Sequence, residues 1–334
     1  MRPRRFFLVF AIGSALAGLV GARASYAAGT GAASIDAPPE DAPPADASAP
    51  DGVGEMVDFS PHFVVGEPVR YEHVLTMTQK RKYGEFAEGV ISLQMVSNLR
   101  FLATRLLPGG GAEVELTFDR LSIDIVPSKA PRVQFDTETD TGGREGTPFI
   151  RALRRVSHTP IIYELDAAGQ VTSLVGADEI ERLVEGLKGY ELIAGVFNEA
   201  WLRELAEDAF GPAGPEPRRR VGASWESELA LQLGGYPGAR TTVRWTVRPA
   251  SDDEVVIEGE GKMTPPVRVD PRLTGLEQRV DGTFSRFGVV WDPVHGRVIS
   301  VEKGGAMNLI HTVADRTLST TSLGTHTLLR FVDQ

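Results

Sequence analysis

Apolar and polar residues alternate along most of the chain beyond about residue 65. In "VRYEHVLTM" the apolar side chains fall mainly at every second position, and His73 shares their face. The same alternation occurs in "SWESELALQL" and "TTVRWTV". A period of two is typical of antiparallel strands with one buried face. The apolar positions on these faces are Val69, Tyr71, Leu75, Met77, Trp225, Leu229, Leu231, Leu233, Val243, Trp245 and Val247.

Three apolar runs are longer than ordinary strands: Glu88–Leu107, Ala112–Val126 and Leu276–Trp291. In the second run the apolar phase changes near Asp119 and Arg120, which predicts a bulge or a twist that keeps both halves facing one core. The glycine-rich stretch "LLPGGGAEV" between the first two runs predicts a hairpin turn. Long, bulged strands are what a strongly curved sheet needs.

The middle of the chain has helical periodicity instead. Apolar residues recur at helical spacing at Phe149, Ile150, Leu153 and Val156. The stretch "IIYELDAAGQVTSLV" then predicts a short hairpin that turns at Ala168 and Gly169. Asp178 and Glu181 have the spacing of a capping box, and Asn198 can cap the helical "EAWLRELAEDAF". We therefore expect three helices between two strand-rich parts.

These patterns predict a mainly β (α+β) fold, a long-stranded curved antiparallel sheet or partial barrel with a helical insertion. Strands at 65–135 and 220–334 flank helices and a hairpin at 148–210, and together they form a single body over 56–334. Both strand parts open with Val-Gly and then an aromatic residue followed by Glu. Internal duplication and a shared way of starting a strand explain this similarity equally well.

Residues 1–27 have the features of a secretory signal peptide. Three arginines lie in the first five residues, and an apolar run follows at 6–22. Cleavage fits after Ala24 or after Ala27, and we favour the second; an uncleaved membrane anchor is the alternative. "RRFFL" resembles a twin-arginine signal, yet the short basic region also fits ordinary secretion, so both routes stay open. The expected location is the periplasm, the cell surface or the medium.

Residues 28–55 predict a disordered tether, because they contain five prolines, six acidic residues and no basic residue. Four arginines lie in the predicted signal, so the remaining chain has 31 basic and 45 acidic residues, a net charge of −14. An acidic chain disfavours nucleic acid as a partner. The chain has no cysteine, which excludes disulfides, thiol nucleophiles and a lipid-modified cysteine.

Motifs for catalysis or cofactor binding are absent from the sequence. The six histidines show no metal-ligand spacing, and there is no HExxH, GxSxG, P-loop or dinucleotide fingerprint. The carboxylates of "FDTETDTGGREG" lack the spacing of a calcium loop, and nothing places Asp119, Asp124 and Asp136 in one cleft. We therefore expect no catalytic residue, no metal, no cofactor and no enzyme activity.

Four stretches resemble, in order and spacing, a domain-of-unknown-function family of exported bacterial proteins. They are "AEVELTFDRLSIDI", "FDTETD", "IIYELDAAGQVTSLVGADEIERL" and "RVGASWESEL", and the resemblance covers most of 65–334. The chain departs from the family pattern at "VSHTPIIYEL". The resemblance implies the strand and helix arrangement described above and lends no catalytic residue.

Curved sheets with helical lids look like those of exported lipid carriers, by analogy of fold alone. The leading hypothesis is a noncatalytic exported protein that binds an apolar ligand or an envelope protein on its concave face, with no membrane span after signal cleavage. The alternative is a structural envelope protein with a filled core, and a hydrolase with an unrecognised site is the third. An empty apolar cavity would favour binding. The expected ligand-binding residues are Leu75, Met77, Leu229, Leu231 and Trp245. The expected lid residues are Leu183, Leu187, Trp201 and Leu205, with hinges at Gly186, Gly189 and Gly195.

Overall fold

The structure is a computed structural model. It describes residues 55–83, 87–140, 147–185, 196–233, 236–249, 254–264, 276–313 and 316–333. The predicted signal peptide, and all of the predicted tether except its last residue, lie outside the described residues.

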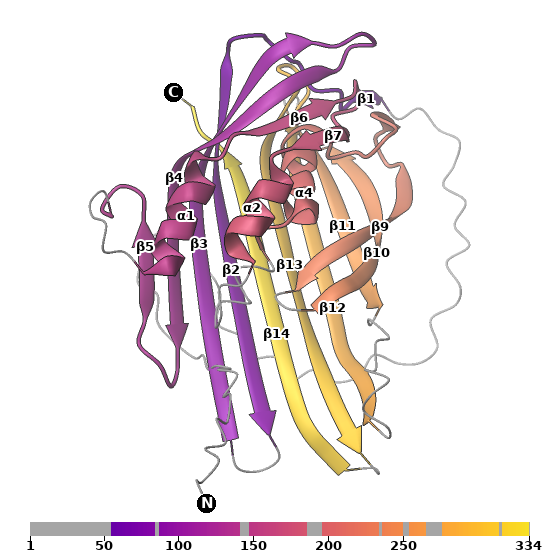
Figure 1. The fold of residues 1–334 in the computed structure, drawn as a ribbon. Helices are drawn as coiled ribbons and strands as arrows, with labels where there is room; N and C mark the ends of the chain where they lie inside the picture. The colour runs from indigo at the N-terminus through magenta and orange to yellow at the C-terminus, as the bar shows by residue number, and fades with distance from the viewer. Residues whose placement is uncertain are drawn as a thin grey trace, which may run out of the picture.

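The described strands form one curved antiparallel sheet and one small ribbon (Figure 1). The strands of the large sheet are β2 (Pro68–Tyr83), β3 (Ala87–Leu106), β4 (Ala112–Pro127), β5 (Val133–Asp136), β6 (Ile161–Leu165), β7 (Val171–Val175), β9 (Ser224–Leu233), β10 (Tyr236–Pro249), β11 (Val255–Thr264), β12 (Leu276–Asp292), β13 (Arg297–Val313) and β14 (Arg316–Phe331). Their order is β7-β6-β4-β3-β2-β14-β13-β12-β11-β10-β9, and β5 pairs with β4. The ribbon pairs β1 (Met56–Asp58) with β8 (Arg218–Arg220). The predicted mainly β fold with a curved antiparallel sheet is confirmed.

The first and last strands of the large sheet are neighbours, because β2 pairs with β14. The predicted bulge in β4 is confirmed. Asn98 pairs with Arg120 and Leu99 pairs with Phe118, so Asp119 is the extra residue. This insertion lets Phe118 and Leu121 both point into the core, where neither is more than 6% exposed.

The helices lie against one face of the sheet, which we call the concave face (Figure 1). In the described part of the chain they are α1 (Pro148–His158), α2 (Ala177–Val184) and α4 (Glu199–Phe210). Strands β9 and β10 curl toward the side that carries the helices, and α4 contacts β9 as well as β13 (Figure 1). The helical insertion therefore covers the upper half of the concave face.

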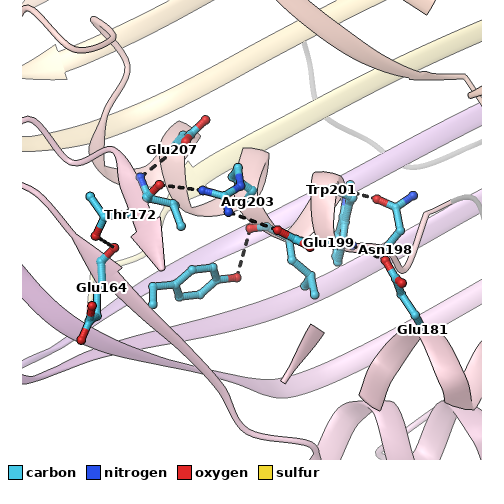
Figure 2. Close-up of polar contacts among 11 residues, drawn as sticks. Glu164, Thr172, Glu181, Asn198, Glu199, Trp201, Arg203 and Glu207 are labelled. Atoms are coloured by element: carbon cyan, nitrogen blue, oxygen red, sulfur yellow. Dashed lines mark hydrogen bonds and ion pairs between the residues drawn. The ribbon is translucent and has the colours of Figure 1, made fainter. Parts of the chain in front are cut away.

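The helix starts confirm one capping prediction and correct another. Asn198 caps α4, since its side-chain oxygen accepts a hydrogen bond from the Trp201 amide at 2.8 Å (Figure 2). The capping box at Asp178 is wrong, because α2 begins after Gly176 without a side-chain cap. Gly176 has a φ of 98°, and a Cβ there would lie 2.5 Å from the Pro160 carbonyl oxygen. Only glycine fits this tight passage from β7 into α2, which places Asp178 inside the first turn.

Buried tyrosines fasten α4 to the sheet. The Tyr71 hydroxyl on β2 lies 3.2 Å from the Val298 carbonyl oxygen and 3.4 Å from the Ala209 carbonyl oxygen at the end of α4. The Tyr163 hydroxyl on β6 donates to the Leu202 carbonyl oxygen at 3.1 Å. Burial raises the pKa of both tyrosines above the usual value, so both hydroxyls stay protonated and able to donate. These contacts fix α4 above the strands that form the candidate site.

Candidate functional site

Two adjoining cavities lie between α4 and the concave face. The smaller one has a volume of about 50 Å³ and is lined by His73, Leu75, Trp201 and Leu205, among others. The larger one has a volume of about 510 Å³ and extends from α4 toward β9 and β10. The smaller cavity has room for a few water molecules and nothing larger. The space beneath α4 is therefore packed, and the usable volume lies beside it.

Three aromatic side chains from separate strands form the apolar wall of the larger cavity. Trp225 on β9 and Trp245 on β10 are directly opposite in register, and their rings stack with centroids 6.3 Å apart. The Phe287 ring on β12 lies 5.4 Å from the Trp245 ring. Gly259 on the intervening strand allows the Trp245 ring to pack across it, because a Cβ there would lie 2.7 Å from that ring. The Trp245 indole N–H donates to the Ser227 hydroxyl at 2.8 Å, which fixes the ring.

A buried ionic cluster separates the two cavities. The ammonium nitrogen of Lys303 on β13 lies 2.7 Å from a Glu204 carboxylate oxygen and 2.6 Å from an Asp208 carboxylate oxygen, both on α4. Lys303 is 13% exposed, and both cavities contact all three residues. Burial raises the pKa of Asp208 to about 7, although Lys303 opposes this shift. Burial lowers the pKa of Lys303, but the two carboxylates outweigh it, so Lys303 stays protonated.

Glu207 is a third carboxylate of α4 at the larger cavity. Its side chain accepts the Val171 amide at 3.4 Å (Figure 2). Burial is the main cause that raises the pKa of Glu207 above its usual range. Burial therefore favours the protonated, neutral form of this carboxyl group.

His73 on β2 is buried in the wall of the smaller cavity, with 1% of its surface exposed. Its ring meets the Trp201 ring edge-on at 5.7 Å. Burial, and secondarily the charge of Lys303, lowers the pKa of His73 to about 3, so the ring is neutral at neutral pH. Its Nδ1 atom has no hydrogen-bond partner in the described part of the chain.

The predicted ligand-binding residues do not all meet at one place. Leu75 lines the smaller cavity and Trp245 lines the larger one. Met77 is not among the described lining residues of either cavity and is buried, with 4% exposure. Leu229 and Leu231 belong to the edge strand β9, but their side chains lie outside the described residues.

Two of the predicted lid residues, Trp201 and Leu205, line the smaller cavity. Leu183 is partly buried against the core. The predictions for Leu187 and the hinge glycines Gly186, Gly189 and Gly195 lie outside the described residues.

Sequence reasoning missed Phe287 and the Lys303 cluster as parts of a site. In "VEKGG", Lys303 is two residues after the buried Val301 and therefore faces the same side of the strand. A lysine at such an inward position could have indicated a buried charged site. Glu204 and Asp208 are four residues apart and therefore share one face of α4.

Asp119, Asp124 and Asp136, the aspartates that could have formed a catalytic acid and base, each contact a different arginine. Asp119 contacts Arg100 at 3.0 Å, Asp136 contacts Arg120 at 2.6 Å, and Asp124 pairs with Arg132. Within the described residues, no group of three or more histidine, aspartate or glutamate side chains is placed to hold a metal ion. No helix in the described ranges is both long enough and apolar enough to cross a membrane.

Comparisons with known proteins give a fold likeness only. No family model and no curated protein matches the sequence, so the resemblance to a family of exported proteins stays a prediction. Among solved structures, lipovitellin, described for its lipid–protein interactions, aligns with a TM-score of 0.44 and 12% identity over 81% of this chain. The alignment spans 26% of the lipovitellin chain.

Two bacterial structures align more weakly. An outer membrane channel from Pseudomonas putida F1 has a TM-score of 0.22 and 7% identity, covering 82% of this chain and 98% of its own. OpdQ from Pseudomonas aeruginosa has a TM-score of 0.19 and 7% identity, covering 80% of this chain and 99% of its own. None of these likenesses identifies a ligand or an activity for this chain.

Proposed function

We propose that the protein is an exported, noncatalytic binding protein that holds a ligand with an apolar body in the larger cavity. The observation that carries the proposal is the aromatic wall of Trp225, Trp245 and Phe287 beside a space of about 510 Å³. Small-molecule sites usually measure about 300–1,000 Å³ and combine apolar walls with a few polar groups. The size and lining of the cavity both fall within this description.

The smaller cavity favours a purely structural protein, and the larger cavity favours a binding protein. Beneath α4 the small volume favours a structural role, because the helix packs onto the sheet without room for a ligand. The larger cavity favours binding, because a filled structural core would not leave a space of this size next to two indole rings. We therefore place the ligand beside α4 and not beneath it.

Export and the absence of catalysis are parts of the same proposal. Export rests on the basic and apolar pattern of residues 1–27. Binding without chemistry rests on the lining of the larger cavity, where lysine and arginine are paired with carboxylates and the tryptophans offer only contact surface.

The test is a titration with N-phenyl-1-naphthylamine, a neutral aromatic probe whose fluorescence rises in apolar surroundings. We expect saturable binding at micromolar concentration to the native protein. Trp225→Ala should weaken it about tenfold or more, since Trp225 offers a large aromatic contact and is only partly buried.

The matched control is Leu106→Ala, because Leu106 is a large apolar residue that is 59% exposed and does not line the cavity. It should bind the probe as the native protein does. Circular dichroism checks that both variants fold. A native protein without saturable binding, or a folded Trp225→Ala variant with unchanged affinity, would contradict the proposal.

A further inference from the structure

A cluster of polar side chains lies where β2 ends and β14 begins, at the end of the sheet farther from the helices (Figure 1). We call it the Arg81 cluster, and its members are Arg81 and Tyr83 on β2, His311 on β13 and Ser319 on β14. Arg81 and Tyr83 are in phase with the buried Met77 and therefore lie on the concave face. Ser319 is directly opposite both Tyr83 and His311, so side chains from three neighbouring strands meet on this face.

The Arg81 cluster is separate from both cavities. None of its four side chains is among the described lining residues of either cavity. Lys303, which both cavities contact, lies eight residues before His311 on β13. Eight residues of a strand span about 26 Å. A ligand held by this cluster therefore does not depend on the ligand proposed for the larger cavity.

Two hydroxyl groups hold the guanidinium of Arg81 in place. Its Nε atom donates to the Thr321 hydroxyl oxygen at 3.2 Å, and its Nη1 atom donates to the Tyr83 hydroxyl oxygen at 2.9 Å. Thr321 is directly opposite Arg81 and is fully buried, so it is a fixed anchor for the guanidinium. The positive charge is therefore positioned before a ligand arrives, which lowers the entropy cost of binding.

The contact with Arg81 leaves the hydroxyl hydrogen of Tyr83 available. Because the Tyr83 oxygen accepts a hydrogen bond from Arg81, its own hydrogen points in another direction. Tyr83 is 46% exposed, and its hydroxyl donates to no acceptor in the described part of the chain. This hydroxyl can therefore donate a hydrogen bond to a ligand that also contacts Arg81.

The pair of His311 and Ser319 also keeps one donor hydrogen. The Nδ1 atom of His311 lies 3.1 Å from the Ser319 hydroxyl oxygen. When Ser319 donates to Nδ1, the neutral imidazole carries its hydrogen on Nε2, and when Nδ1 donates, the Ser319 hydrogen is left over. Partial burial, and secondarily the charge of Arg81, lowers the pKa of His311 and favours the neutral ring. Either arrangement therefore offers one hydrogen to a ligand.

We infer that the Arg81 cluster is a binding site for a phosphate group. It combines a fixed guanidinium with one donor from Tyr83 and one from the pair of His311 and Ser319. Oxyanions suit such a set, because their oxygens only accept hydrogen bonds and guanidinium groups pair with them strongly. A phosphate group has three terminal oxygens for these three donor groups, whereas a carboxylate has two. Inorganic phosphate and the head group of an amphiphile present the same oxygens, and the test below distinguishes them.

Imidazole signals in proton–carbon NMR spectra of the full-length protein test the inference at the site itself, and the variant His311→Gln identifies the signal of His311. Inorganic phosphate is titrated at constant pH and constant ionic strength, with chloride as the replaced anion. We expect a shift of the His311 signal that saturates at millimolar phosphate. Decyl phosphate, below micelle formation, reports the source. Binding about tenfold tighter than that of inorganic phosphate indicates the head group of an amphiphile, and equal binding indicates the free anion.

Two variants remove parts of the site. Tyr83→Phe keeps the ring and removes the hydroxyl, so it should weaken phosphate binding about fivefold. Arg81→Gln removes the charge and should weaken binding about tenfold or more. The matched control is Arg330→Gln, because the 59% exposed Arg330 contacts Glu72 on the face of β14 opposite to Ser319. This control should bind phosphate as the native protein does.

The native protein and either folded variant can overturn the inference. Native protein whose His311 signal shows no saturable shift with phosphate would contradict it, and so would unchanged affinity in folded Tyr83→Phe or Arg81→Gln protein. Should Arg81→Gln not fold, Tyr83→Phe decides the question, since its side chain is partly exposed. Neither result alters the binding of N-phenyl-1-naphthylamine in the larger cavity, so failure of this site would leave the proposed function standing.

Discussion

Replacing His73 by phenylalanine is expected to stabilise the protein more at pH 5 than at pH 8. The ring of His73 is 1% exposed and packs edge-on against Trp201, an arrangement that phenylalanine can keep. Burial and then Lys303 lower the pKa of His73 from 6.5 to about 3. Between these values the unfolded chain takes up a proton and the folded protein does not, so stability falls as the pH drops from 6.5 toward 3.

The size of the effect follows from the same shift. A pH of 5 is about 1.5 units below the ordinary pKa of the imidazole in the unfolded chain. Each unit corresponds to about 1.4 kcal/mol of unfolding free energy. The native protein should therefore lose about 2 kcal/mol of unfolding free energy between pH 8 and pH 5 through this residue alone. Asp208, whose pKa is raised to about 7, acts in the opposite direction. Between pH 3.8 and pH 7 the folded protein keeps a proton on Asp208 that the unfolded chain releases, so this residue lowers the stability of the protein as the pH rises. Its contribution is present in both proteins and cancels in their difference.

Urea denaturation followed by tryptophan fluorescence, at pH 5 and pH 8, measures both proteins. The stability gain of His73→Phe should be about 2 kcal/mol larger at pH 5 than at pH 8. The control is Leu106→Ala, an exposed apolar position without a titratable group, and it should give equal changes at both pH values. An equal gain at both pH values for His73→Phe would refute the burial of a neutral imidazole against Lys303.

Two further predictions concern stability. Lys303→Met should cost about 3–5 kcal/mol in urea denaturation, because Glu204 and Asp208 then lose their buried counter-charge. The triple variant with Glu204→Gln and Asp208→Asn should recover at least half of that loss, and no recovery would contradict the cluster. Asn198→Ala should cost about 1 kcal/mol through the lost α4 cap. Asp178→Ala should cost about half of that or less, since Asp178 does not cap α2. Thermal unfolding measures both variants, and equal losses of stability for Asn198→Ala and Asp178→Ala would support the predicted capping box.

The curved sheet was predictable because its causes are local. Alternation in β2 determines which residues face the core, and the phase change around Asp119 requires one extra residue in β4. The α2 start was not predictable in the same way. Its left-handed turn at Gly176 results from the close approach of the Pro160 carbonyl, a contact that only the folded hairpin creates.

The candidate site was predictable only in part, because it depends on which strands become neighbours. Trp245 could be assigned to the concave face from alternation alone. Its stacking on Trp225 depends on the β9–β10 register, and its proximity to Phe287 depends on a glycine at position 259 in the strand between them. The pairing of Lys303 with α4 joins residues about a hundred positions apart, for which the sequence offers no local signal.

Native mass spectrometry of the full-length protein, purified from the cells that produce it, tests the central claim most directly. We predict a copurifying small molecule with an apolar body, released by organic extraction and absent from a folded Trp225→Ala variant. The Leu106→Ala control should retain it. Native protein that carries no small molecule, and that does not take up N-phenyl-1-naphthylamine at micromolar concentration, would contradict the account and favour a purely structural role.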